Sequence, residues 1–105
     1  MRSGLLLLPV ALALLAALPA SAQDARALNV KSLTATCANC HGTNGRAVEG
    51  SAVPGLAGLN AAYTIEQMKA FKSGARQATV MHQIAKGYSD TQVEAIAGYF
   101  AAQPR

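Results

Sequence analysis

The chain has 105 residues, of which 51% are apolar, with nine Lys and Arg against five Asp and Glu, two cysteines and no tryptophan. Such a length fits one domain and excludes a large multidomain enzyme. Two cysteines can form only one disulfide, which excludes a small scaffold held together by several disulfide bonds.

The first 22 residues have the features of a secretory signal peptide. A charged start at Arg2 precedes an apolar stretch over Leu5–Leu18, and Ala20-Ser21-Ala22 gives the small-residue pattern of a cleavage site. The apolar stretch is too short to cross a bilayer comfortably, and no second one follows it. We therefore predict a signal peptide at 1–22, a single domain at 23–105 and no stable membrane anchor. The alternative is an N-terminal helix that is never cleaved.

The predicted mature chain has few large apolar side chains. Leu, Ile, Val and Phe make up 14 of its 83 residues, or 17%. Ordinary globular domains carry more, and a net charge of only +3 does not explain the shortfall as disorder. A domain this small usually needs a disulfide, a metal or a cofactor to be stable. The composition thus favours a bulky apolar cofactor before any motif is considered.

The first expected element is a helix over Ala25–Ala38. One face of this helix carries four residues at the spacing i, i+3, i+4, i+7, namely Val30, Leu33, Thr34 and Cys37. The segment 42–59 follows with five glycines and Pro54, which predicts an extended loop that passes close to another group. Loops of this length without regular structure are usually functional.

A second helix is expected over Thr64–Ser73. Thr64 and Gln67 have the spacing of a capping box, and Gly74 is a typical residue for the end of a helix. The next segment, Ala78–Lys86, is ambiguous, and we expect a loop that passes into a short helical turn.

The clearest element is a helix over Ser89–Gln103. Ser89 and Gln92 form another capping pair, and Pro104 ends the helix. One face carries the apolar residues Val93, Ile96, Ala97 and Phe100. No segment alternates like a strand, so the sequence predicts an all-α fold of three to four short helices.

The string Cys37-Ala38-Asn39-Cys40-His41 is the most informative part of the sequence. C-x-x-C-H is the attachment signal of a c-type haem. Two thiols three residues apart lie on one side of a helical turn, where they can form thioethers with the two vinyl groups of one porphyrin. His41 then comes under the ring and can reach the iron. We therefore expect one covalently bound haem c, with Cys37 and Cys40 as its attachment residues.

The C-x-x-C pair has three other interpretations. A thioredoxin-like dithiol normally occurs in a βαβ context, which is not predicted here. A zinc site would need four ligands, and the mature chain offers only His41 and His82 besides the two cysteines. A plain structural disulfide is the third alternative. The adjacent histidine and the predicted export favour haem attachment over all three.

The iron of such a haem has a sixth position, and its ligand affects the reduction potential. Met81 lies in a poorly periodic stretch that could approach the iron opposite His41, and it is the preferred candidate. His82 competes with it, although a lone histidine is more often a solvated or hydrogen-bonded residue. Met68 lies on the apolar face of the second predicted helix, where we expect it to fill the core.

Four stretches together resemble a class I cytochrome c, namely CANCHGTNG at 37–45, VPGLAGL at 53–59, TVMHQI at 79–84 and Tyr99-Phe100. The resemblance covers nearly all of residues 23–105. It implies the class I cytochrome c fold, with the first and last helices crossing beside a haem crevice. It also implies His41 and Met81 as axial ligands, and Pro54 as the residue whose carbonyl accepts from the ring N–H of His41, a bond that orients the imidazole.

A narrower resemblance comes from MKAFKSGAR at 68–76, TVMHQIAKGYSD at 79–90 and IAGYFAAQ at 96–103. These stretches are similar to the cytochrome subunit of flavocytochrome c sulfide dehydrogenase, in which a flavoprotein subunit oxidises sulfide and passes the electrons on. Some of those relatives carry two haem domains, whereas this chain has one attachment motif.

The sequence therefore predicts an exported, periplasmic one-electron carrier and not an enzyme, because no catalytic acid, base or nucleophile stands out. Its expected partners are redox proteins, in particular a sulfide-oxidising flavoprotein. A freely diffusing cytochrome is the alternative, and a thiol–disulfide oxidoreductase that uses Cys37 and Cys40 is a remote one. The small positive charge, partly offset by two haem propionates, gives no support for binding of nucleic acids.

Overall fold

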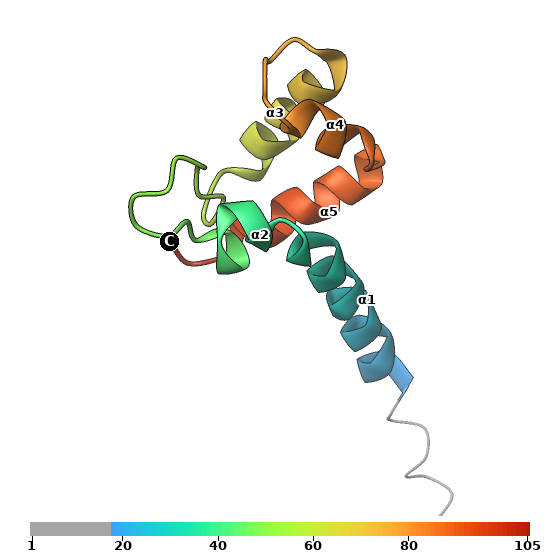
Figure 1. The fold of residues 1–105 in the computed structure, drawn as a ribbon. Helices are drawn as coiled ribbons and strands as arrows, with labels where there is room; N and C mark the ends of the chain where they lie inside the picture. Colours follow the sequence, from blue (N-terminus) through green and yellow to red (C-terminus); the bar gives the residue numbers. More distant parts are fainter. Residues whose placement is uncertain (1–17) are drawn as a thin grey trace, which may run out of the picture.

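The computed structural model describes the backbone of residues 18–105 and the side chains of residues 21–105. Residues 1–17, which hold most of the predicted signal peptide, lie outside this range. Every regular element in the described range is a helix (Figure 1). In chain order these are α1 (Leu18–Ala35), α2 (Ala38–His41), the 3-10 turn η1 (Thr43–Gly45), α3 (Ala61–Ser73), α4 (Met81–Lys86) and α5 (Asp90–Ala101).

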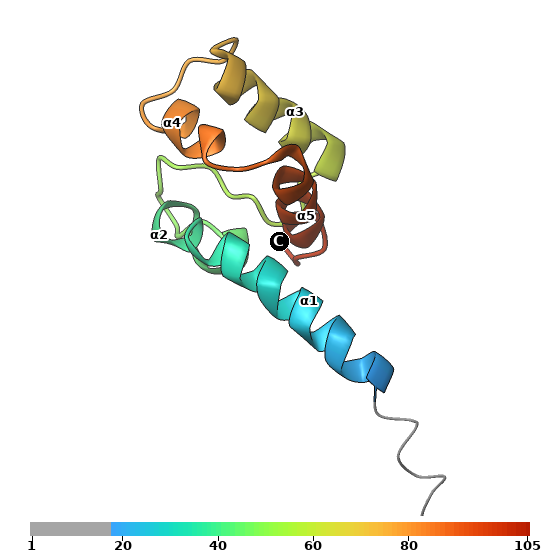
Figure 2. The same ribbon diagram turned by 90° about the vertical axis from the view of Figure 1, so that its right-hand side faces the viewer.

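The C-terminal helix α5 is central to the arrangement. It packs against the C-terminal part of α1 on one side and against α3 on the other, and α3 also packs against α4 (Figures 1 and 2). The short helix α2 continues from the end of α1 after a turn. The first and last helices are therefore in contact, as the sequence resemblance implied.

The core is small and is centred on α3, α4 and α5. Met68, Ala85 and Val93 form a buried cluster, one residue from each of these helices. Phe100, near the end of α5, is the largest fully buried side chain of the described residues, at 1% exposure. Three of the seven buried apolar residues in the range 21–105 are alanines, which agrees with the scarcity of large apolar residues in the composition.

The first helix differs from its predicted range at both ends. It was expected over 25–38, but α1 starts at Leu18 and stops at Ala35. At its end, the Thr34 hydroxyl donates to the Lys31 carbonyl and the Cys37 amide donates to the Thr34 carbonyl, both at the i, i+3 spacing. This spacing tightens the last turn and breaks the helix before Cys37.

The early part of α1 runs through the predicted cleavage site after Ala22. Its residues 21–29 are all exposed, so this stretch is stabilised by local helix propensity rather than by packing. None of the helices in the range 18–105 is both long enough and apolar enough to cross a membrane.

The cap predicted for the second helix was wrong. Thr64 lies inside α3 and is buried, and the helix begins three residues earlier. The cap is Asn60, whose side-chain oxygen accepts from the Tyr63 amide at 3.2 Å. The local pattern of Thr64 and Gln67 imitates a capping box, but the core-facing position of Thr64 overrides it.

The other helix ends agree with the sequence, except that α5 stops at Ala101, two residues before the predicted end at Gln103. Gly74 closes α3 in the left-handed conformation (φ 79°). The ambiguous stretch at 78–86 contains the short helix α4, closed by Gly87. The capping box of Ser89 and Gln92 is present in both directions at the start of α5.

We expect Met68→Ala to lower the free energy of unfolding by about 2–5 kcal/mol, because Met68 is only 9% exposed and its removal leaves a cavity in the cluster with Ala85 and Val93. Glu66→Ala, at an exposed position of the same helix, is the control and should change stability by less than about 0.5 kcal/mol. Denaturant unfolding of the two variants measures the difference. Equal, small losses would mean that Met68 is not part of the core.

Candidate haem-binding site

The C-x-x-C-H motif forms one turn of backbone at the junction of α1 and α2. Cys37 lies in the turn between these helices, and Cys40 and His41 belong to α2. The amides of Cys40 and His41 both donate to the Cys37 carbonyl, at 3.3 and 2.9 Å. Cys37 is half-buried, Cys40 is exposed, and neither forms a disulfide. Both thiols are thus held on one short helical turn beside His41.

The ring of His41 is fixed by the loop that follows. Its Nδ1 lies 2.6 Å from the carbonyl oxygen of Pro54. A carbonyl oxygen can only accept, so Nδ1 carries the proton and donates it. The other ring nitrogen, Nε2, is then left with a free lone pair, which is the form that binds a metal. The structure therefore brings together His41 and Pro54, as the resemblance implied.

The turn η1 connects the motif to the loop that carries Pro54. The carbonyl of Gly45 accepts from the amides of Leu56 and Ala57, at 2.7 and 3.1 Å. Asn44 is left-handed (φ 54°) and directs the chain into this turn. Because Leu56 follows Pro54 by only two residues, these two hydrogen bonds set where the Pro54 carbonyl lies.

Glycine is required at Gly42 and Gly45 for steric reasons. A Cβ atom at Gly42 would lie 1.8 Å from the Arg46 carbonyl oxygen, and one at Gly45 would lie 2.7 Å from the ring of Phe100. Both residues also have positive φ. The glycines that the sequence suggested for close approach therefore serve, at these two positions, to let the chain fold back on itself and on α5.

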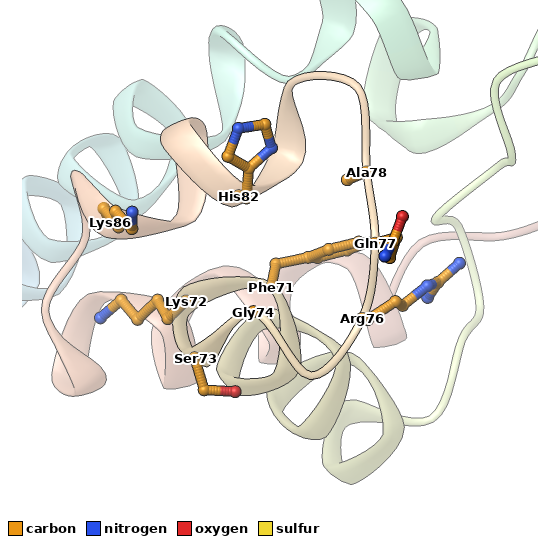
Figure 3. A pocket seen from close by; sticks show the side chains of 9 residues that line it. All are labelled: Phe71, Lys72, Ser73, Gly74, Arg76, Gln77, Ala78, His82 and Lys86. Atoms are coloured by element: carbon orange, nitrogen blue, oxygen red, sulfur yellow. The ribbon is translucent and has the colours of Figure 1, made fainter.

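Met81 and His82 are neighbours in sequence but lie in different surroundings. Met81, the first residue of α4, is half-buried and packs against the cluster of Met68, Ala85 and Val93. His82 instead lines a surface cavity between α4 and the end of α3, among side chains that include Lys72 (Figure 3). Its Nδ1 is buried there without a hydrogen-bond partner.

A further contact links the motif to the segment after α4. The hydroxyls of Thr36 and Tyr88 lie 3.2 Å apart, although 52 residues separate them in sequence. Tyr88 is itself held by Lys72, whose ammonium donates to the Tyr88 carbonyl and lies 3.7 Å from a carboxylate oxygen of Asp90. Residues next to Cys37 are thus tied to the end of the segment that contains Met81.

The chemistry of these residues fits a covalently attached haem. Two free thiols stand on one turn, and the adjacent imidazole has its proton on the nitrogen that faces the Pro54 carbonyl. Among the described side chains, no group of three His, Cys, Asp or Glu residues gathers closely enough to bind a metal ion without a porphyrin.

The family comparison gives the same result. The pattern of the cytochrome c family matches residues 27–103, which is most of the chain. The chain belongs to the cytochrome c family. Membership implies a covalently bound haem c and a function in electron transfer.

Several curated proteins are similar over part of the chain. Each of the following matches covers 65% of the chain. The chain is 38% identical to the thiosulfate dehydrogenase electron acceptor of Stutzerimonas stutzeri and 40% identical to the cytochrome subunit of sulfide dehydrogenase of Chlorobaculum tepidum. It is 37% identical to cytochrome c-554(548) of Halomonas halodenitrificans. The matches cover 32%, 60% and 84% of these proteins, respectively. The chain thus spans about a third to three fifths of the length of the first two relatives.

The solved structures confirm the class I cytochrome c fold. Cytochrome c4 from Pseudomonas stutzeri matches with a TM-score of 0.60 and 32% identity, over 65% of this chain and 38% of that one. Cytochrome c4 from Acidithiobacillus ferrooxidans matches with a TM-score of 0.62 and 32% identity, over 79% of this chain and 49% of that one.

Two features of the site were missed in the sequence. The left-handed Asn44 could have been predicted, because Asn-Gly is a strong turn signal. The bond between Thr36 and Tyr88 has no local signal, because it joins residues that only the tertiary fold brings together.

We expect Gly45→Ala to destabilise the protein by about 1–3 kcal/mol more than Gly50→Ala. Both glycines have similar φ values, 76° and 78°, so both variants lose about 1–2 kcal/mol from the left-handed backbone. Only the new methyl group at Gly45 meets Phe100 and the Ala57 amide, whereas a Cβ at Gly50 meets nothing within 4 Å. Paired unfolding curves test this, and equal losses would show that the close approach to α5 is unimportant.

Proposed function

We propose that the chain carries single electrons through one haem that is bound to Cys37 and Cys40 and ligated by His41 and Met81. The observation that carries this proposal is the bond from His41 Nδ1 to the Pro54 carbonyl. This bond selects the tautomer and the ring orientation that an axial ligand requires. Iron ligation explains why His41, which lies next to two free cysteines, is held by the Pro54 carbonyl.

The chain's own residues have separate tasks in this function. The haem, when bound, supplies an iron that accepts and releases one electron. Cys37 and Cys40 hold it by thioethers, which suits a chain with too few apolar side chains to retain a cofactor by burial alone. The Pro54 carbonyl accepts the hydrogen bond from Nδ1 of His41 and so leaves Nε2 available for the iron.

Met81 is proposed as the second axial ligand in preference to His82. Met81 packs against the core cluster, whereas His82 is among the residues that line the surface cavity. A thioether ligand raises the reduction potential relative to a second imidazole. The bond between Thr36 and Tyr88 supports this assignment, because it ties the end of the α4 segment to the attachment motif.

The proposed partner is a flavoprotein that oxidises sulfide and passes its electrons to this chain. The support is the 40% identity to the cytochrome subunit of sulfide dehydrogenase of Chlorobaculum tepidum, a match that covers 60% of that protein. The alternative is a freely diffusing carrier. Its support is the match to cytochrome c-554(548) of Halomonas halodenitrificans, which covers 84% of that protein and whose name does not mark it as a subunit. The relative named as an electron acceptor of thiosulfate dehydrogenase adds a second class of sulfur-oxidising donor.

Purification of the native protein separates these alternatives. Co-elution with a flavin-containing protein, together with reduction of the haem on addition of sulfide, would support the subunit. A monomer that is reduced by thiosulfate dehydrogenase or exchanges electrons with several oxidases, and that elutes without flavin, would support the free carrier.

The thiol–disulfide oxidoreductase remains the remote alternative, and the surroundings of Cys37 argue against it. Burial raises the pKa of the Cys37 thiol above its ordinary value, and hydrogen bonds from the Thr36 side chain and the backbone offset this only in part. Reactive dithiols need the opposite shift, because the thiolate is the nucleophile. Titration of free thiols decides the matter, since thioether-bonded cysteines do not react.

We further propose that the protein works in the periplasm after cleavage following Ala22. The support is the N-terminal sequence pattern at 1–22 and the exposure of residues 21–29 in α1, which packs on the rest of the domain only later in its length. Mass spectrometry of the mature protein would show a chain that starts at Gln23 and carries one haem.

We expect Met81→Ala to open the iron to external ligands such as imidazole or cyanide, while the haem stays covalently bound through acid extraction. The matched control is Met68→Ala, which should cost stability but leave the optical spectrum of the iron unchanged, because Met68 is a core residue. Spectra of both variants with and without added ligand test the assignment. An unaltered spectrum in Met81→Ala would remove Met81 from the site.

A further inference from the structure

We propose that Tyr99 is a positioning residue for the axial ligand His41, acting through Asn44 and the loop that carries Pro54. This inference rests on the proposed ligation of iron by His41. Tyr99 does not belong to the attachment motif or to the pair of proposed ligands, and it reaches the site from the far end of the chain, on α5.

The first step is a hydrogen bond between Tyr99 and Asn44. The phenol hydroxyl donates to the Asn44 side-chain oxygen at 2.7 Å, across a sequence separation of 55 residues, in a partly buried place. Asn44 has φ 54°, a conformation that a non-glycine residue adopts at a cost. The bond from Tyr99 holds the asparagine side chain and so stabilises this strained turn.

The second step leads from the turn to the loop. The residue after Asn44 is Gly45, whose carbonyl accepts from the amides of Leu56 and Ala57. Two residues before Leu56, the Pro54 carbonyl accepts from His41 Nδ1. The orientation of the turn at Asn44 therefore affects the position of the Pro54 carbonyl, and this carbonyl orients the imidazole of His41.

The third step is a second attachment of the same loop to α5. The amide of Gly58 donates to the Phe100 carbonyl at 2.8 Å, and the buried Gly45 lies against the Phe100 ring. The rings of Tyr99 and Phe100 meet edge to face, with centroids 5.4 Å apart. Tyr99 and Phe100 therefore fix the turn and the loop from one rigid helix end.

The chemical consequence lies in the basicity of His41. A strong bond from Nδ1–H to a carbonyl makes the imidazole a more basic ligand, and a more basic ligand favours the oxidised over the reduced iron. If the loop loosens, the bond to Pro54 weakens and the reduction potential rises. Tyr99 thus tunes the potential without touching the haem ligand.

The test is Tyr99→Phe in the mature haem-bearing protein, because this change removes the hydroxyl and keeps the ring packing. We expect a higher reduction potential and a several-fold faster exchange of the His41 ring N–H with solvent, measured by voltammetry and NMR. Asn44→Gly, which keeps the positive φ and removes the amide, should produce the same two changes. The double variant should add little, because the two residues act through one bond.

Tyr63→Phe is the control, since it removes a hydroxyl from a ring that is 48% exposed on α3; it should leave the potential and the exchange rate unchanged. The proposal is overturned if Tyr99→Phe only lowers stability, with both readouts as in the parent. Additive shifts in the double variant would overturn it as well. If the proposed function itself is wrong, the NMR spectrum of the unmutated protein will show no iron-bound His41. This result is distinct from a failure of the proposal for Tyr99.

Discussion

The hydrogen bond between His41 Nδ1 and the Pro54 carbonyl is the interaction on which the proposed haem site depends. It joins a side chain on α2 to the backbone of a loop, and only one assignment of the proton satisfies both atoms. The attachment motif alone would place a histidine near a porphyrin with two possible tautomers. The loop removes that ambiguity, which is why the segment 42–59 has to follow one defined path.

That path is held by hydrogen bonds within the segment and by contacts with α5. The segment carries five glycines and few large side chains, so it cannot form a core of its own. Phe100 supplies a buried ring and a carbonyl, and Tyr99 supplies a hydroxyl, all within the last turns of one helix. In a domain with so little apolar surface, one helix thus serves both the packing of the core and the geometry of the site.

The sequence predicted those parts of the molecule whose chemistry is local. The all-α fold, the last helix with its Ser89 cap and the helical turn that carries Cys37 and Cys40 each follow from neighbouring residues, because caps and helix faces are formed within a few turns. The cap at Thr64 was mistaken for the same reason, since a local pattern carries no information on which residue faces the core. The bonds from Tyr99 to Asn44 and from Tyr88 to Thr36 could not be predicted, because they depend on distances set by tertiary packing.

The two sides of the proposed site are held in different ways. His41 is fixed by a chain of directional hydrogen bonds that ends on α5, whereas Met81 rests on the packing of a short helix against Met68 and its neighbours. Packing contacts of a flexible thioether are individually weak and easily rearranged. A disturbance of the fold larger than the loss of one core side chain should therefore release Met81 before His41. With a haem bound, the iron would then first become accessible at the Met81 position, while His41 and the two cysteines would still hold the cofactor.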